Sequence, residues 1–206
     1  MGFEQALPWL LTALAAGYLI GSIPMGILVS RLFGLGDLRQ IGSGNIGATN
    51  VLRTGNRAAA GLTLVLDAAK AALPVLYFLG WGDLAAQAAG AGALIGHCFP
   101  IWLRFRGGKG VASCLGVLLG LAWPAGLAAC ATWLAVAGTI RISSVAGMLS
   151  ALSGPVWLWF LDGPRAVLLA AGLGVLITLR HHENLGRLWR GTEPKIGSQN
   201  TTINRD

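Results

Sequence analysis

Residues 41–53 form a polar, glycine-rich segment in a chain that is mostly apolar. Glycines let backbone N–H groups approach an anion closely, and a guanidinium such as that of Arg53 grips phosphate through two parallel hydrogen bonds. The spacing of Gly42, Gly44 and Gly47 formally matches a dinucleotide fingerprint, but the segment follows an apolar helix and no strand, so we reject a Rossmann fold. An ordinary turn between helices is the alternative. The candidates for phosphate binding are Gly42, Ser43, Gly44, Asn45, Thr49, Asn50 and Arg53.

A second polar segment, residues 96–112, carries glycines around a single lysine and leads into another apolar stretch. Free N–H groups, the positive end of the following helix and the Lys109 ammonium would converge there on one anion. It is not a Walker A loop, because Gly110 follows Lys109 and the first glycine of that motif is missing. We interpret Arg104 and Arg106 as a solvated edge that contacts lipid headgroups. The candidates are His97, Gly107, Gly108, Lys109 and Gly110, with a structural role in holding the loops left open for His97.

The third polar segment, residues 180–195, contains two adjacent histidines. If the preceding helix continues, His181 and Asn184 share one face. A metal site at His181, His182 and Glu183 is poorly supported, since adjacent side chains point apart and no further ligand cluster is visible. We therefore predict neither a metal nor a cofactor. The candidates are His181, Asn184 and Glu193, the last with a structural alternative, and Ser143 and Ser144 join them from beside Arg141.

Membrane helices are the elements that must position these segments. The chain has 206 residues, of which 54% are hydrophobic and 11% charged, unlike a soluble domain. Uncharged runs long enough to cross a bilayer, which takes about 20 helical residues, predict an all-α integral membrane protein. Gly116 and Gly120 have the spacing of close helix contact, and Cys98, Cys114 and Cys130 have no metal-site spacing. The expected crossings are residues 7–30, 58–79, 84–103, 111–123, 125–140, 144–161 and 165–180.

Basic residues set the orientation of these seven crossings. With the N-terminus outside and the C-terminus cytoplasmic, all basic residues fall on the inner side except Arg165 outside and Lys70 within a helix, as the positive-inside rule demands. A single helix over 110–140 would reverse everything after it, so we predict a break at Trp123 and Pro124. Asp67 and Lys70, one turn apart within a helix, either neutralise each other or serve the function. Residues 1–197 are expected to form one domain, with a disordered polar tail over 198–206.

The three segments together resemble one enzyme family. Gly-Ser-Gly-Asn-Ile-Gly-Ala-Thr-Asn-x-x-Arg from Gly42, Gly-His-x-Phe-Pro with Gly-Gly-Lys-Gly-Val-Ala, and Arg-His-x-x-Asn-x-x-Arg from Arg180 are similar to the motifs of the bacterial acyl-phosphate:glycerol-3-phosphate acyltransferases, often called PlsY. All three motifs occur in order, and Gly21-Ser22-Ile23-Pro24 and Leu66-Asp67 also match. Arg106 and Ser113 stand where Lys and Thr are common in the family.

The resemblance implies an enzyme of the cytoplasmic (inner) membrane with its active site facing the cytoplasm. It would move a fatty acyl group from acyl phosphate to glycerol 3-phosphate, giving lysophosphatidic acid and phosphate, the first committed step of bacterial phospholipid synthesis. We expect direct transfer without a covalent acyl-enzyme, because no nucleophile and base can be read from the sequence. A soluble enzyme that makes acyl phosphate is a candidate partner. The expected catalytic residues are Ser43, Arg53, Lys109, His181 and Asn184, and the other candidates above would bind substrate.

Other functions explain the sequence less well. A transporter of organic phosphates would need polar residues at mid-membrane and access from both sides, whereas polar residues here gather on one face. The His-x-x-x-x-Asp motif of acyltransferases with soluble donors is absent from the sequence. The net charge of +7 comes without a nucleic-acid-binding motif, so anionic lipids or phosphorylated substrates explain it better.

Overall fold

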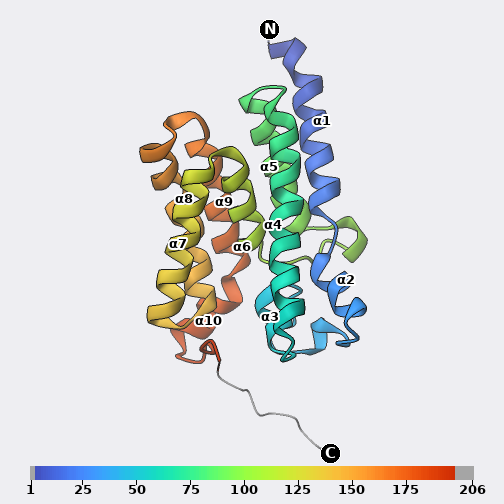
Figure 1. Cartoon of the computed structure of the whole chain (residues 1–206), viewed down its shortest axis with the longest axis vertical. Coiled ribbons are helices and arrows are strands. Elements are labelled where there is room, and N and C mark those ends of the chain that lie inside the picture. Colours follow the sequence, from blue (N-terminus) through green and yellow to red (C-terminus); the bar gives the residue numbers. More distant parts are fainter. Residues whose placement is uncertain (1–2, 198–206) are drawn as a thin grey trace, which may run out of the picture.

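The computed structural model describes residues 3–197, which form a helical bundle with short connections (Figure 1). The expected tail over 198–206 lies outside the described residues. The α-helices are α1 (Phe3–Gly21), α2 (Met25–Leu32), α3 (Ala48–Leu52), α4 (Arg57–Leu79), α5 (Asp83–Cys98), α6 (Val111–Leu121), α7 (Trp123–Ile140), α8 (Ser143–Leu161), α9 (Val167–Arg180) and α10 (His182–Trp189). Short 3₁₀ turns are η1 (Leu38–Gln40), η2 (Ile101–Leu103) and η3 (Pro164–Ala166).

These helices follow the apolar runs of the sequence. Five stretches within the described chain are long and apolar enough to cross a membrane, and a sixth is possible if α9 with its 3₁₀ turn and α10, bent by 60° against each other, count as one. The first expected crossing is interrupted between α1 and α2, where Pro24 cannot continue a helix. The predicted break after α6 is present, at the extended residue Ala122, and Pro124 lies in the first turn of α7. By length, α6 falls short of a full crossing.

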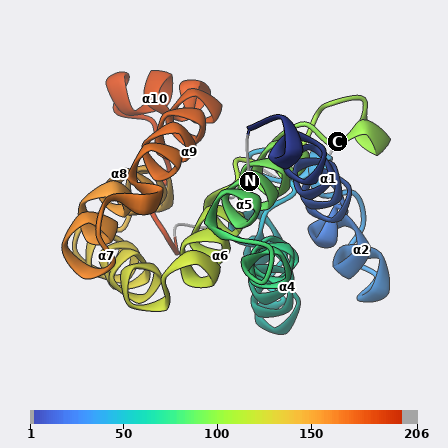
Figure 2. The same ribbon diagram turned by 90° about the horizontal axis from the view of Figure 1, so that it is seen from above.

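The bundle has two groups of helices joined by α6 (Figure 2). In one group α5 packs against α1 and α4, and in the other α8 packs against α7 and α9. Between them, α6 contacts α4 on one side and α7 on the other. The largest buried cluster includes Leu94, Leu118 and Ile177, from α5, α6 and α9, so the two groups share one core.

Glycines bring the backbones of α1 and α5 into direct contact. A Cβ atom on Gly17 or Gly21 would overlap the backbone of Ala89 or Ala93, respectively. Such close approach is typical of helices that associate inside a membrane. The hydrophobic effect does not drive helix association there, and small residues allow close van der Waals packing. Gly116 of α6 lies in the same way against the backbone of Ala68 in α4, as its spacing predicts.

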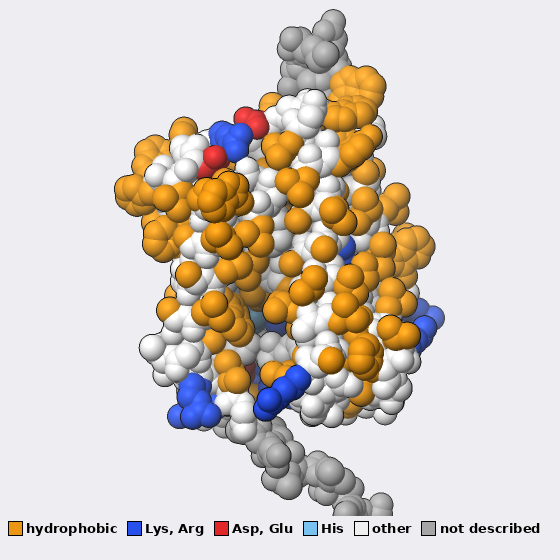
Figure 3. Space-filling model, in the orientation of Figure 1, with side chains coloured by type: hydrophobic (Ala, Val, Ile, Leu, Met, Phe, Trp, Pro, Cys, Tyr) orange, Lys and Arg blue, Asp and Glu red, His pale blue; other side chains and the backbone are white. Residues whose placement is uncertain are grey.

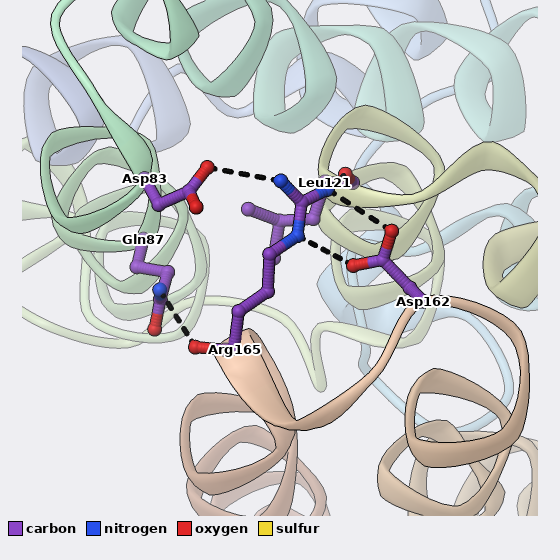
Figure 4. Close-up of polar contacts among 5 residues, drawn as sticks. All are labelled: Asp83, Gln87, Leu121, Asp162 and Arg165. Carbon is purple, nitrogen blue, oxygen red and sulfur yellow. Dashed lines mark hydrogen bonds and ion pairs between the residues drawn. The ribbon is translucent and has the colours of Figure 1, made fainter.

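At the end of the bundle drawn uppermost in Figure 1, one arginine ties several helices together (Figure 4). The Arg165 guanidinium pairs with Asp162 at the end of α8 and lies 3.0 Å from Asp83 at the start of α5. It also donates to the Leu121 carbonyl of α6 at 2.9 Å, while Gln87 donates to the Arg165 carbonyl. The Arg165 clamp, as we call these contacts, therefore joins the two helix groups at this end.

Candidate active site

The three polar segments meet at the opposite end of the bundle around a cavity of about 530 Å³. Figure 3 shows a hollow between the two helix groups, with basic and histidine side chains deep inside it and hydrophobic side chains along its sides. Residues from positions 42–53, 109–112 and 181–194 line this cavity, so segments far apart in sequence form one site.

The loop before α3 is held in shape by a buried amide. Asn50 is 2% exposed, and its side chain donates to the Leu38 carbonyl at 2.8 Å while accepting from the backbone N–H of Ser43 at 3.2 Å. Gly42 has φ of +53°, and a Cβ atom there would overlap the Arg53 side chain, so only glycine lets that side chain cross the turn. The loop thereby brings Ser43 and Arg53 to the cavity wall.

Backbone and side-chain contacts fix the second loop beneath α6. The N–H groups of Gly107 and Gly108 donate to the carbonyls of Cys98 and His97, both at 3.1 Å. On the other side, the Arg180 guanidinium donates to the carbonyls of Gly107 and Gly108. Gly110 then takes a left-handed conformation, with φ of +86°, and α6 begins at Val111. Val111 and Ala112 line the cavity, so the N–H groups of the first turn of α6, which have no partner within the helix, lie at the site.

The third segment bends at its histidine instead of continuing as one helix. α9 ends at Arg180, where the last crossing was expected to end, and α10 begins at His182, so the helix does not continue unbroken through this segment. His181 and Asn184 both line the cavity. His181 Nδ1 lies 2.8 Å from the Ile177 carbonyl, which can only accept, so Nδ1 carries the proton. The other ring nitrogen, Nε2, is then an acceptor.

A chain of hydrogen bonds links the lysine loop to the end of α10 and to α8. The Lys109 ammonium donates to the Asn184 carbonyl oxygen, and the Asn184 amide donates to Glu193 at 2.5 Å. Because an ammonium only donates and a carboxylate only accepts, these partners fix the orientation of the amide. Glu193 also accepts from Ser144 and Arg187, each at 2.7 Å. Separately, the Thr49 and Ser143 hydroxyls lie 3.1 Å apart and connect the first loop to α8.

The charges at this site are set by partial burial. Burial, and then the positive charge of Arg187, lower the pKa of Lys109 to about 8, although Glu193 opposes the shift. Burial lowers the pKa of His181 to about 4, so its ring is neutral at pH 7. Burial alone would raise the pKa of Glu193, but hydrogen bonds from Asn184, Ser144 and Arg187 hold it below its usual value. The site therefore presents cations and neutral hydrogen-bonding groups, and the Glu193 carboxylate is already satisfied by its three donors.

Beneath the loops lies a buried ionic cluster of Asp67, Lys70 and His97, all at most 5% exposed. Lys70 Nζ lies 2.8 Å from Asp67 Oδ1 and donates to the Ile23 carbonyl at 2.7 Å. His97 Nδ1 lies 3.5 Å from the same carboxylate oxygen. On its other side, the His97 ring abuts Gly108, where a Cβ atom would overlap it. The cluster therefore supports the loop that presents Lys109.

The remainder of the cavity wall is apolar. It comes from three helices, and its residues are Leu64 and Ala68 of α4, Val111, Leu115 and Leu119 of α6, and Cys130, Trp133 and Leu134 of α7. The cavity thus has a polar end suited to anions and an apolar side suited to a hydrocarbon chain.

Sequence comparison places this architecture in a family. The profile of the family described as glycerol-3-phosphate acyltransferase matches residues 11–191, most of the chain. The chain belongs to the glycerol-3-phosphate acyltransferase family. The resemblance seen in the three motifs is thereby confirmed.

Relatives and solved structures of the family agree over nearly the whole length. A glycerol-3-phosphate acyltransferase of Cereibacter sphaeroides is 55% identical, with 95% of this chain and 94% of the relative covered. One from a Jannaschia species is 58% identical, covering 91% and 92%. The crystal structure of PlsY, an integral membrane glycerol 3-phosphate acyltransferase, in its glycerol 3-phosphate form superposes with a TM-score of 0.86 at 34% identity, covering 91% of this chain and 96% of that one.

Most of the candidates predicted from the family motifs line the cavity, including all five proposed catalytic residues. The others at the wall are Gly42, Asn45, Thr49, Asn50, His97, Gly110, Ser143, Ser144 and Glu193. Gly44, Gly107 and Gly108 do not line it. The N–H groups of Gly107 and Gly108 are already used within the loop, so these glycines shape the site and do not donate to an anion.

Several residues at the cavity were not among the candidates. Arg187 lies one helical turn after Asn184, and that i, i+3 spacing together with its motif position was a usable signal. Asp67 also lines the cavity, from within α4. The apolar wall, including Cys130 and Trp133 of α7, had no signal, because apolar residues in a membrane helix look alike. Within residues 3–197, no group of three or more His, Cys, Asp or Glu side chains is placed to hold a metal ion.

Proposed function

We propose that this protein transfers a fatty acyl group from acyl phosphate to glycerol 3-phosphate, giving lysophosphatidic acid and phosphate. The observation that supports it most is one cavity with a cationic, hydrogen-bonding end and an apolar side formed by α4, α6 and α7. Such a cavity suits a phosphorylated alcohol together with an acyl chain dissolved in the bilayer. The printed name of the family and the glycerol 3-phosphate form of the related PlsY crystal structure agree with this acceptor.

Within this proposal the chain is a single domain of the cytoplasmic membrane that crosses it seven times, with α6 as a short crossing. The N-terminus lies outside, and the cavity opens toward the cytoplasm. Supporting this orientation, the stretch from α2 to α3 and the segment after α9, which carry several of the basic residues, lie at the cavity end of the bundle (Figure 1). The connection between α8 and α9, which includes Arg165, lies at the other end. A short α6 would be accommodated by local thinning of the bilayer or by the water-filled cavity beside it.

The transfer is direct in this proposal. The acceptor hydroxyl oxygen attacks the acyl carbonyl carbon, the bond from that carbon to the phosphate oxygen breaks, and the departing phosphate takes the hydroxyl proton. Arg53, Lys109 and the N-terminus of α6 hold the phosphates, and positioning with charge stabilisation provides most of the acceleration. Ser43 is an unsuited nucleophile, because its hydroxyl contacts the Asn50 carbonyl oxygen at 3.4 Å, which is no base.

His181 orients the acceptor in this scheme. A ring with a pKa of about 4 is a poor proton acceptor at neutral pH, whereas its Nε2 atom still accepts a hydrogen bond from an alcohol. Asn184 and Glu193 hold Lys109 in place from the other side. In this proposal the donor's own phosphate oxygens therefore take the hydroxyl proton, and Lys109, protonated at pH 7, binds phosphate instead of acting as a base.

The test is an assay of purified protein with glycerol 3-phosphate and either acyl phosphate or acyl-CoA. We expect lysophosphatidic acid from acyl phosphate alone. Lys109→Ala and Arg53→Ala should abolish turnover while the protein stays folded and membrane-inserted, and Arg57→Ala, which removes an exposed charge at the start of α4, should not. Transfer from acyl-CoA, or full activity in either cavity variant, would overturn the proposal.

A further inference from the structure

A second cavity lies outside the active site, between α2 and the loop that carries η2. Its volume is about 730 Å³, and residues of α2, of positions 34–39 and of η2 line it. None of these residues lines the active-site cavity. Its chemistry is therefore independent of the proposed transfer reaction.

One residue of the cavity wall, Ser30, has a buried hydroxyl that forms no hydrogen bond with the described residues. Ser30 is 1% exposed. Leaving a buried polar group unsatisfied is costly, and a ligand that reached this hydroxyl through a small side-chain movement would gain a hydrogen bond there.

The charges around Ser30 indicate an anion. Arg31 and Arg39 line the cavity, against a single carboxylate from Asp37, which is engaged in accepting from the Arg39 backbone N–H at 3.0 Å. Two guanidinium groups beside a free hydroxyl are suited to a phosphate group.

The rest of the lining indicates that this phosphate belongs to a lipid. Ile27, Leu28, Trp102 and Leu103 form the apolar part of the wall. Leu28 is 46% and Trp102 61% exposed, so both face the surroundings of the bundle, and tryptophan is the residue typical of the headgroup level of a bilayer. Anionic headgroups attract clustered arginines at such a level.

We propose that this cavity binds one anionic phospholipid of the leaflet next to the active site, with its phosphate between Ser30, Arg31 and Arg39 and its chains along Leu28 and Trp102. The choice of leaflet rests on the orientation given under the proposed function. Hydrogen bonds connect this cavity to the active site. The carbonyl of Leu38, in the cavity wall, accepts from the Asn50 side chain, which in turn accepts from the Ser43 backbone N–H. We expect a lipid in the cavity to act on the phosphate-binding loop through these contacts.

Lipid binding can be measured without any acyl transfer, so this proposal can be tested independently of the proposed function. Full-length protein is titrated in detergent with phosphatidylglycerol, phosphatidylcholine or inorganic phosphate, following the thermal midpoint and the number of retained lipids by native mass spectrometry. We expect one retained lipid with phosphatidylglycerol and none with phosphatidylcholine, and stabilisation by phosphatidylglycerol that depends on Arg31 and Arg39. Inorganic phosphate also binds the proposed active site, so any stabilisation by it should persist when Arg31 and Arg39 are replaced. Arg31→Gln with Arg39→Gln should weaken that binding about tenfold for each arginine removed. Ser30→Ala should weaken it less.

The matched control is Arg57→Gln with Arg190→Gln, which removes the same charge from exposed positions outside the cavity and should bind phosphatidylglycerol like the wild type. Equal phosphatidylglycerol binding by the Arg31 and Arg39 variant would overturn the proposal, as would equal stabilisation by phosphatidylcholine. Stabilisation by inorganic phosphate and not by phosphatidylglycerol, if it is lost in the Arg31 and Arg39 variant and kept in Lys109→Ala, would assign the cavity to a soluble anion instead. In active preparations, phosphatidylglycerol should lower the KM for glycerol 3-phosphate in the control and not in the Arg31 and Arg39 variant.

Discussion

Lys109 shows how the site controls the charge of a single residue. Its ammonium is partly buried next to Arg187 and is oriented by Asn184, and its pKa of about 8 lies close to physiological pH. Only the protonated form attracts phosphate. Binding of an anionic substrate and retention of the proton are therefore coupled at this position.

Activity should consequently decline on the alkaline side. We expect kcat/KM for glycerol 3-phosphate to fall as pH rises through about 8, because Lys109 then loses its charge. Lys109→Arg should be slower but should move this limb to higher pH, since a guanidinium stays protonated. Lys109→Ala should lose turnover altogether, which exceeds the roughly 100-fold that one charge-stabilising donor is worth. An alkaline limb at the same pH in Lys109→Arg would show that another group titrates.

Proton transfer should not depend on a histidine. His181→Asn and His97→Asn are each expected to lower activity and to leave transfer well above background, because lost hydrogen bonds cost less than a lost general base. A general base is worth about 100- to 10,000-fold. Steady-state rates over a pH series distinguish the two cases. If the wild-type rate falls at low pH, and either variant no longer shows that fall and is also slower by the whole factor expected for a general base, that histidine is the base.

Individual site residues could be predicted from the sequence where polar residues interrupt an apolar chain. Ser43, Arg53 and Lys109 could be chosen because glycines and cations rarely cluster without a reason. The structural role of Gly107 and Gly108 could not be predicted. Their N–H groups donate to the carbonyls of Cys98 and His97, and these contacts depend on how the loop folds back on the end of α5.

At the scale of the helices, α4 and α6 approach each other closely at Gly116, where a Cβ atom would lie 2.1 Å from the Ala68 carbonyl oxygen. Gly116→Ala should destabilise the protein by about 1–3 kcal/mol, because the added Cβ atom overlaps the Ala68 backbone. Gly138→Ala in α7 is the matched control, since nothing lies within 4 Å of its Cβ position, and should leave the stability unchanged or slightly higher. Thermal unfolding of both variants in one detergent tests this. Equal midpoints would contradict tight contact between α4 and α6.

The pair of Asp67 and Lys70 within α4 should behave as a unit. Asp67→Ala leaves the buried Lys70 ammonium without its carboxylate and is expected to cost about 3–5 kcal/mol. Replacing both, with Asp67→Ala and Lys70→Met, should restore much of that stability, because no unpaired charge is then buried. Chemical denaturation of the single and double variants measures the coupling. Additive losses would show that the two charges do not depend on each other.

Helix boundaries were predictable to the extent that breaks have a local cause. The interruption after α6 follows from Pro124, and that between α1 and α2 from Pro24. The bend at His181 has no proline or glycine beside it. It accompanies a local contact of His181 with the Ile177 carbonyl and the contact of Asn184 with Lys109, which is tertiary and leaves no periodic signal.

For the whole molecule, the Arg165 clamp joins the helix groups at the end remote from the active site (Figure 4). Arg165→Gln should lower the thermal midpoint, corresponding to about 1–2 kcal/mol, because the carboxylates of Asp83 and Asp162 and the Leu121 carbonyl lose their common donor. The KM for glycerol 3-phosphate should stay near its wild-type value. Arg190→Gln, another exposed arginine, is the control and should not shift the midpoint. A changed KM with an unchanged midpoint would contradict a purely structural role.

The contact between α1 and α5 has a consequence for biogenesis. The first helix is synthesised and inserted well before the partner whose backbone its glycines touch. Until then, the surface around Gly17 and Gly21 faces lipid or the insertion machinery, and α1 has only its less extensive contact, with α4, which is synthesised before α5. Assembly therefore has to wait for α5, and we expect nascent chains that end before Asp83 to be degraded faster in cells than chains that extend past Cys98.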